Sequence, residues 1–269
     1  MLAIKNNLMA ANAARYLGAS YDNLATSVER LSSGLRINSA SDDAAGMAVR
    51  ELMRADIAVL QQGARNAQDG VSMLQTMEGA MQVQDNLLLR MQQLAEQAAT
   101  GTYSSAQRVI MDNEFDQLVA EIQRIASSTD FNGIKMLDNS ATVSIHFGGA
   151  SDKIDIVGSK MTKAGLGISA LAITTVAGAK SAITALDSAI NAKDTARAKF
   201  GYNINRLEST GQVLNIQAEN LLAAESRISD VDVATEMATL TRNQVLSQAG
   251  TSMLAQANSI PQMALTLLR

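Results

Sequence analysis

The sequence predicts a mainly α-helical protein: a long antiparallel helical rod with one β-hairpin and a coiled-coil pair formed by the two ends of the chain. Three observations support this fold class. Apolar residues recur at helical spacings of three and four through most of the 269 residues, and a single proline interrupts them. One short stretch alternates between apolar and polar residues, as a β-strand does. Heptad stripes occur near both termini.

The two terminal stripes predict an assembly surface. A stripe of this kind cannot be buried by its own helix, so we expect the two ends to pair with each other and with copies of themselves. Because an unpartnered helix is marginal in water, we also expect both ends to be disordered in the free chain. The N-terminal stripe consists of Leu17, Tyr21, Leu24, Val28, Leu31 and Leu35. The C-terminal stripe has a large register, Leu246, Met253, Ile260 and Leu267, and a small one, Gly250, Ala257 and Ala264.

The pattern of apolar residues in the first half of the chain predicts three helices. The first covers residues 3–34 and ends at Gly34, and residues 35–43 form a polar connector. Ser41 or Asp42 is expected to cap the second helix, which is long and reaches about residue 100. Three of its glycines weaken the helix or instead permit close approach of a neighbouring helix: Gly63, Gly70 and Gly79. A third helix begins at Ser104 or Ser105 and continues to about residue 127.

The second half changes period and then returns to helix. Asn132-Gly133 is a turn signal, and alternation on either side of a short loop predicts a hairpin over residues 142–157. Residues 158–174 show no clear pattern. Helix resumes over residues 179–224, and Ser229-Asp230 is expected to cap the last helix. Pro261 lies inside that helix and predicts a bend or a loosened turn.

These elements predict two domains. Residues 1–42 and 226–269 would form a discontinuous terminal coiled-coil domain. Residues 43–225 would form a helical rod domain, with the hairpin region at about residues 131–157.

The composition argues against several classes of function. The formal net charge is −4, so no general basic field attracts nucleic acid. The chain has no cysteine, which excludes disulfides and thiol chemistry, and its only histidine, His146, cannot by itself form a two-histidine metal site. No apolar run predicts a membrane span or a cleaved Sec signal peptide. We therefore expect no catalysis, cofactor or metal, and export, if it occurs, by another route.

Several sequence motifs resemble the signatures of bacterial flagellins. The segment Leu31–Gly46, Leu-Ser-Ser-Gly-Leu-Arg-Ile-Asn-Ser-Ala-Ser-Asp-Asp-Ala-Ala-Gly, resembles the N-terminal signature. Residues 224–232, Ala-Glu-Ser-Arg-Ile-Ser-Asp-Val-Asp, resemble the C-terminal one, together with Gln256-Ala257-Asn258 and the ending Leu-Leu-Arg. Thr129–Gly133, Thr-Asp-Phe-Asn-Gly, matches a middle element. The resemblance covers nearly the whole chain.

The resemblance implies a structural subunit that polymerises into the extracellular flagellar filament for swimming motility. It implies a terminal domain lining the filament channel, surrounded by the rod domain. Only the short region at residues 158–178 stands where many relatives carry outer domains, so a minimal form is expected. Its partners would be further copies of itself, an export chaperone on residues 230–269, the filament cap and the hook–filament junction proteins, with export through the flagellar type III apparatus. Neither nucleic acid nor membrane is expected as a partner.

The resemblance also implies a patch for the flagellin-sensing Toll-like receptor of animals. Its residues would be Arg90 and Leu94, four residues apart on one helix, and Glu114 from the next helix. The alternative is that these residues only stabilise packing. The hairpin likewise has two interpretations: contacts along a row of subunits with a part in filament shape switching, or a solvated cap on the rod.

Two other protein classes share the helical pattern. A hook–filament junction protein related to flagellin also has coiled-coil stripes at both ends of its chain. The complete C-terminal signature nevertheless favours the filament subunit. A cytoplasmic coiled-coil signalling module with a hairpin tip would instead have ordered termini in the free protein.

Overall fold

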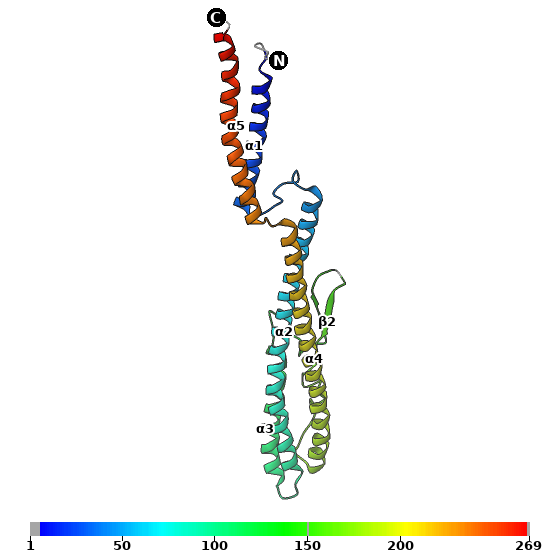
Figure 1. The fold of residues 1–269 in the computed structure, drawn as a ribbon. Helices are drawn as coiled ribbons and strands as arrows, with labels where there is room; N and C mark the ends of the chain where they lie inside the picture. Colours follow the sequence, from blue (N-terminus) through cyan, green and yellow to red (C-terminus); the bar gives the residue numbers. More distant parts are fainter. Residues whose placement is uncertain (1–5, 150, 268–269) are drawn as a thin grey trace. The chain divides into compact units, whose positions relative to one another are not determined.

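The computed structural model describes residues 6–149 and 151–267, and it confirms the expected mainly helical fold with one hairpin. The order of elements is α1 (Leu8–Ser33), α2 (Ala44–Ala99), α3 (Ser105–Ser128), β1 (Thr142–His146), β2 (Lys153–Val157), α4 (Val176–Ser229) and α5 (Val233–Leu267), shown in Figure 1. The chain folds into two compact units. The terminal unit comprises Met1–Ile57 and Glu219–Arg269, and the central unit comprises Ala58–Ala218.

Helix ends follow local capping chemistry, in one case shifted by a residue from the expectation. Gly34 ends α1 in the left-handed conformation, φ 74°, and its N–H donates to the Arg30 carbonyl, as expected. The cap of α2 is Asp43 instead of Ser41 or Asp42, because the Gly46 N–H donates to Asp43 Oδ1 at 2.9 Å. Asp42 is unavailable as the cap because its carboxylate accepts the backbone N–H groups of the connector.

The start of α5 also differs from the expectation. Helix α4 continues to Ser229, and the Asp230 N–H donates to the Ser226 carbonyl, so these residues close α4 and do not open α5. Asp232 caps α5 by accepting the Ala234 N–H at 3.1 Å and the Thr235 hydroxyl at 2.6 Å. Helix α5 continues across the position of Pro261 and does not end there.

The central unit is built on α2, α3 and α4, and both α3 and α4 run antiparallel to α2. Gln84 on α2 donates to the Ile122 carbonyl of α3, and Gln92 on α2 donates to Asp187 of α4. Their shared core contains few aromatic residues and many long flexible ones, which fill irregular space between helices. Its fully buried members include Leu74, Met77, Met81, Leu88, Met91, Phe115, Ile122, Leu186, Phe200 and Leu207.

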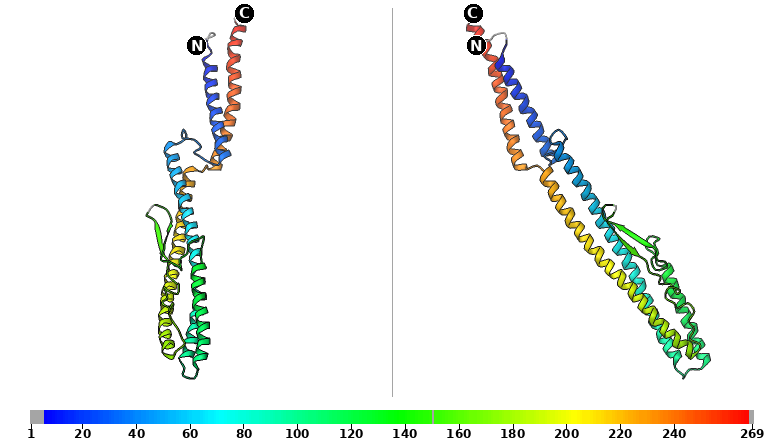
Figure 2. Two further views of the ribbon diagram at one scale, coloured as in Figure 1. Left: turned by 180° about the vertical axis from the view of Figure 1, so that it is seen from behind. Right: turned by 90° about the vertical axis from the view of Figure 1, so that its right-hand side faces the viewer.

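The β-hairpin packs on α2 and α4 through one face (Figures 1 and 2). Its antiparallel register pairs Val143 with Ile156 and Ile145 with Ile154, and the two β2 isoleucines are buried. Close approach depends on Gly63 of α2, where a Cβ would lie 2.1 Å from the Phe147 carbonyl oxygen. The glycine therefore admits the hairpin backbone and not a neighbouring helix.

The segments flanking the hairpin are more ordered than their sequence suggested. Asn132 and Gly133 have φ of 51° and 78°, which is the two-residue turn that the Asn-Gly pair predicts. Residues 158–174, which lack a sequence pattern, bury four apolar side chains against the helices: Met161, Leu166, Ile168 and Ile173. Main-chain bonds from Ser159 to Met136 and from Met161 to Leu137 hold this segment in place.

Candidate assembly surface

In the terminal unit, α1 and α5 lie side by side and antiparallel (Figures 1 and 2). The Asn7 side chain donates to the Ala257 carbonyl at 2.8 Å at one end of the pair. At the other end, Arg30 lies 3.9 Å from Glu236. The two ends of the chain therefore pair within one molecule.

The contact between α1 and α5 uses only half of the predicted N-terminal stripe. Leu17, Leu24 and Leu31 are partly buried, whereas Tyr21 and Val28 are 49% and 52% exposed. The buried face of α1 also includes the small polar residues Ser20 and Ser27, together with the alanines at positions 10 and 13. Leu35 lies beyond the helix, partly buried, and forms an isolated β-bridge with Asp230.

The two registers of α5 separate in the same way. Gly250 and Ala257, from the small register, face α1, and a Cβ on Gly250 would lie 3.0 Å from Leu17 Cδ1. Leu246 and Met253, from the large register, are 50% and 63% exposed. Ile260 is partly buried. The side chains of Ala264 and Leu267 lie outside the described residues.

The buried face of this helix pair is therefore unusually polar. Ser27 on α1 and Asn243 and Ser247 on α5 are all buried. A buried polar residue in a helical seam fixes the register at a cost in stability. The pair is thus well specified in alignment, while part of its apolar stripe, including Leu246 and Met253, stays exposed.

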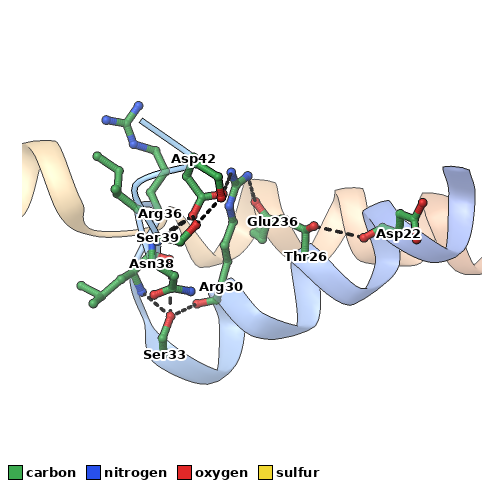
Figure 3. Close-up of polar contacts among 12 residues, drawn as sticks. Asp22, Thr26, Arg30, Ser33, Arg36, Asn38, Ser39, Asp42 and Glu236 are labelled. Atoms are coloured by element: carbon green, nitrogen blue, oxygen red, sulfur yellow. Dashed lines mark hydrogen bonds and ion pairs between the residues drawn. The ribbon is translucent and has the colours of Figure 1, made fainter. Parts of the chain in front are cut away.

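A charged cluster joins α1, the connector and α5 (Figure 3). The Arg30 guanidinium lies 3.7 Å from Asp42 and 3.9 Å from Glu236. Asp42 also accepts the backbone N–H groups of Ser39 at 2.9 Å and Asn38 at 3.1 Å. The Ser39 N–H, followed by the Ser39 hydroxyl, the Asn38 N–H and the Arg30 charge, lowers the pKa of Asp42 below its ordinary value.

Neither Arg30 nor Glu236 belongs to the terminal stripes that the sequence predicts. Charge was the sequence signal that could have identified this pair. Antiparallel pairing brings the C-terminal end of one terminal helix next to the N-terminal end of the other, and the two residues carry opposite charges there. The same region is tied to the end of α4, since the Arg36 N–H donates to the Ser229 carbonyl and the Val231 N–H donates to the Gly34 carbonyl.

The three residues expected in a receptor patch do not share one exposed surface. Arg90 donates to Glu114 at 2.7 Å, and both side chains are about half exposed. Leu94 is 3% exposed and belongs to the core of the central unit. The receptor patch stays a prediction, supported on the surface by Arg90 and Glu114 alone.

The described residues offer little for catalysis. They contain no group of three metal-ligating side chains and no helix long and apolar enough to cross a membrane. His146 is exposed on β1, and its carbonyl oxygen accepts a hydrogen bond from the Asn66 side chain.

Comparison with known proteins agrees with this geometry. The family model of the bacterial flagellin N-terminal helical region matches residues 4–142, and that of the C-terminal helical region matches residues 183–268. The chain belongs to the bacterial flagellin family. It is 44% identical over 272 residues to a flagellin of Halalkalibacterium halodurans, with 100% of both chains covered. It is also 44% identical over 287 residues to the flagellar filament 33 kDa core protein of Treponema phagedenis, again over 100% of both chains.

A solved structure supports the fold of this flagellin. The crystal structure of Bacillus cereus flagellin superposes with a TM-score of 0.51 at 35% identity, covering 60% of this chain and 94% of that one. This flagellin is a structural, non-enzymatic subunit of the flagellar filament. Full-length similarity to filament core proteins favours this role over the junction-protein and signalling alternatives.

Proposed function

We propose that this flagellin polymerises through the outward stripes of α1 and α5, with the α1–α5 pair serving as the scaffold that presents them. One observation supports the proposal above others: both terminal stripes are wider than the contact within the molecule. The small register of α5 faces inward, whereas large apolar residues are left on the outside. The outward residues of the predicted set are Tyr21, Val28, Leu246 and Met253.

Hydrophobic burial supplies the driving force. Covering one such side chain contributes about 1.5–3 kcal/mol before the cost of ordering. A filament multiplies this gain because every subunit repeats the same contact. The contacts are heterologous, with the stripe of one subunit meeting a different surface of the next, since head-to-tail contacts that do not close produce a helical polymer.

The proposed filament domains follow the division of the chain into terminal helices that assemble and central helices that form the rod. Residues 1–42 and 226–269 form the filament core, and residues 43–225 form the rod without outer variable domains. The hairpin makes contacts along a row of subunits. A cleft of about 590 Å³ between the hairpin and α4 supports this, with Phe147, Lys153 and Arg206 among its lining residues.

We extend the proposal to partners that handle the chain before and after assembly. An export chaperone covers residues 230–269, because the apolar side chains on the outward stripe of α5 would otherwise be exposed to water. The filament cap and the hook–filament junction proteins meet the same terminal surfaces at the two ends of the polymer. A Toll-like receptor would meet the exposed Arg90–Glu114 pair.

The test compares two substitutions at one outward position. Leu246→Asp introduces a charge where a neighbour must pack, so the critical concentration for seeded polymerisation should rise about tenfold or more. Leu246→Met preserves an apolar side chain of similar volume and should polymerise like the parent chain. Sedimentation of filaments measures both, and thermal unfolding checks that the central unit is unchanged. Parent-like assembly of the aspartate variant would refute the proposal.

A further inference from the structure

The methionines of this flagellin are divided between its two units. The chain has 14 methionines and no cysteine, so thioethers are its only sulfur groups. Seven of the described methionines are buried in the central unit: Met73, Met77, Met81, Met91, Met111, Met136 and Met161, all at most 8% exposed. On the terminal helices, Met9, Met237, Met253 and Met263 are 67%, 47%, 63% and 53% exposed.

Exposure decides which thioethers an oxidant reaches first. A hydroperoxide transfers one oxygen to methionine sulfur: the S–O bond forms, the O–O bond breaks, the sulfur loses two electrons and the peroxide is reduced to water or an alcohol. The product, methionine sulfoxide, is polar and chiral, and it disrupts apolar contacts. The buried methionines of the central unit are shielded from this reaction, whereas those of α1 and α5 are accessible.

Met253 is the exposed methionine at which oxidation matters most for assembly. It lies on the outward register of α5, seven residues from Leu246 and seven from Ile260. It is also only three residues from Gly250, which contacts Leu17 of α1. A sulfoxide there would place a strong hydrogen-bond acceptor in the middle of an apolar stripe, where burial without a donor is costly.

We propose that Met253 is an oxidation site that controls whether a free subunit can join the filament, with a hydroperoxide as the oxidant. The inference rests on the proposed role of the α5 stripe in polymerisation. In the free chain the Met253 thioether is accessible and reacts. In the filament a neighbouring copy covers it and protects it. Oxidation therefore removes subunits before assembly and leaves existing filament intact.

The test uses the full-length chain in partially oxidised form. Free protein is treated with hydrogen peroxide until about half of the exposed methionines are oxidised, then mixed with filament seeds. Pellet and supernatant are separated, and mass spectrometry measures the sulfoxide fraction at each methionine. We expect Met253 sulfoxide to be depleted at least tenfold in the pellet. Sulfoxide at Met237, on a different face of α5, is the internal control and should be nearly equal in both fractions.

Three further measurements complete the test. Treatment with methionine sulfoxide reductases should restore polymerisation, because these enzymes reverse the modification. Met253→Leu should polymerise after peroxide treatment, whereas Met237→Leu should remain sensitive. Met253 in preformed filaments should oxidise at least tenfold more slowly than in the free chain.

The outcomes separate the two proposals. Equal Met253 sulfoxide in pellet and supernatant overturns the oxidation proposal, as does equal reactivity of Met253 in filament and free chain. Met253→Gln, without any oxidant, places a permanent polar group in the stripe. If it polymerises like the parent chain, the role of the stripe itself fails. If it is blocked while oxidised parent chain polymerises, only the oxidation proposal fails.

Discussion

At the scale of single residues, small side chains decide where elements can touch. Gly63 and Gly79 lie in the same helix, yet only Gly63 has a neighbour against it. A Cβ at Gly63 would lie 2.1 Å from the Phe147 carbonyl oxygen, whereas a Cβ at Gly79 would meet nothing within 4 Å. The sequence predicted that a neighbouring element could approach closely at both glycines. The structure distinguishes them because only Gly63 lies under the hairpin.

Matched alanine substitutions in α2 test this difference. Gly63→Ala should destabilise the chain by about 1–3 kcal/mol, because the Phe147 backbone must move away. Gly79→Ala should stabilise it by up to about 1 kcal/mol, since it removes only the helix cost of glycine. Thermal or urea unfolding measures both, and amide exchange at residues 142–157 locates the effect. Equal responses of the two variants would contradict the proposed hairpin contact.

Helix caps and turns are predictable from single residues only where one residue type suits the position. Gly34 and the Asn132-Gly133 turn were predicted correctly because each has a chemistry suited to a single backbone conformation. For α3 the sequence left Ser104 and Ser105 open, and the structure makes Ser104 the cap. Asp43 and Asp232 were missed because each lies near another acidic residue that could serve equally well. Only the fold determines which carboxylate faces the helix end and which closes a neighbouring turn.

At the scale of elements, a polar ladder fixes the register between α2 and α4. Three α2 residues spaced seven apart, Glu78, Asp85 and Gln92, meet Arg197, Lys193 and Asp187 of α4. Lys193 is the most enclosed member, with a side chain only 2% exposed, and it pairs with Asp85 and with Asp194. A slip of α2 along α4 would take Asp85 away from this buried ammonium and leave it only Asp194, its exposed neighbour on α4, which is expensive.

A double-substitution cycle tests the ladder. Asp85→Leu alone should cost about 3 kcal/mol or more, because Lys193 loses its principal partner inside the core. Adding Lys193→Leu should recover most of that loss by removing the buried charge that Asp194 alone compensates poorly. Glu78→Ala is the matched control: its pair with Arg197 is about one-third exposed, so the expected loss is about 1 kcal/mol or less. Denaturant unfolding measures the parent chain, the two single leucine variants, the double variant and the Glu78→Ala control. Additive effects of the two leucine substitutions would exclude coupling.

At the scale of the whole molecule, the two units differ in what stabilises them. The central unit has a continuous apolar core. The buried residues of the α1–α5 pair are instead Ser27, Asn243, Ser247 and Ala257. The leucines of the contact are only partly buried, and other large apolar side chains are exposed. Because apolar burial is the main favourable term in folding, the terminal helices are held weakly until a neighbour covers them.

Amide hydrogen exchange on the free chain tests this difference. Amides of α1 and α5 should exchange at least a hundredfold faster than those of α2 and α3 in the central unit, because the helix pair opens at low cost. After seeding, the same terminal amides should become protected. Protection of α1 and α5 equal to that of the central helices in the free chain would show that ordering does not depend on assembly.

The sequence by itself determined the helix order, the hairpin, the terminal stripes and the family signatures, because periodicity and turn chemistry are local properties. It did not determine which half of each stripe is covered within the molecule. That depends on the alignment of α1 against α5, which brings together residues more than two hundred positions apart in the sequence. Only the tertiary structure could assign Gly250 and Ala257 to the inside and leave Leu246 and Met253 for a neighbour, because two helices in contact bury one face of each.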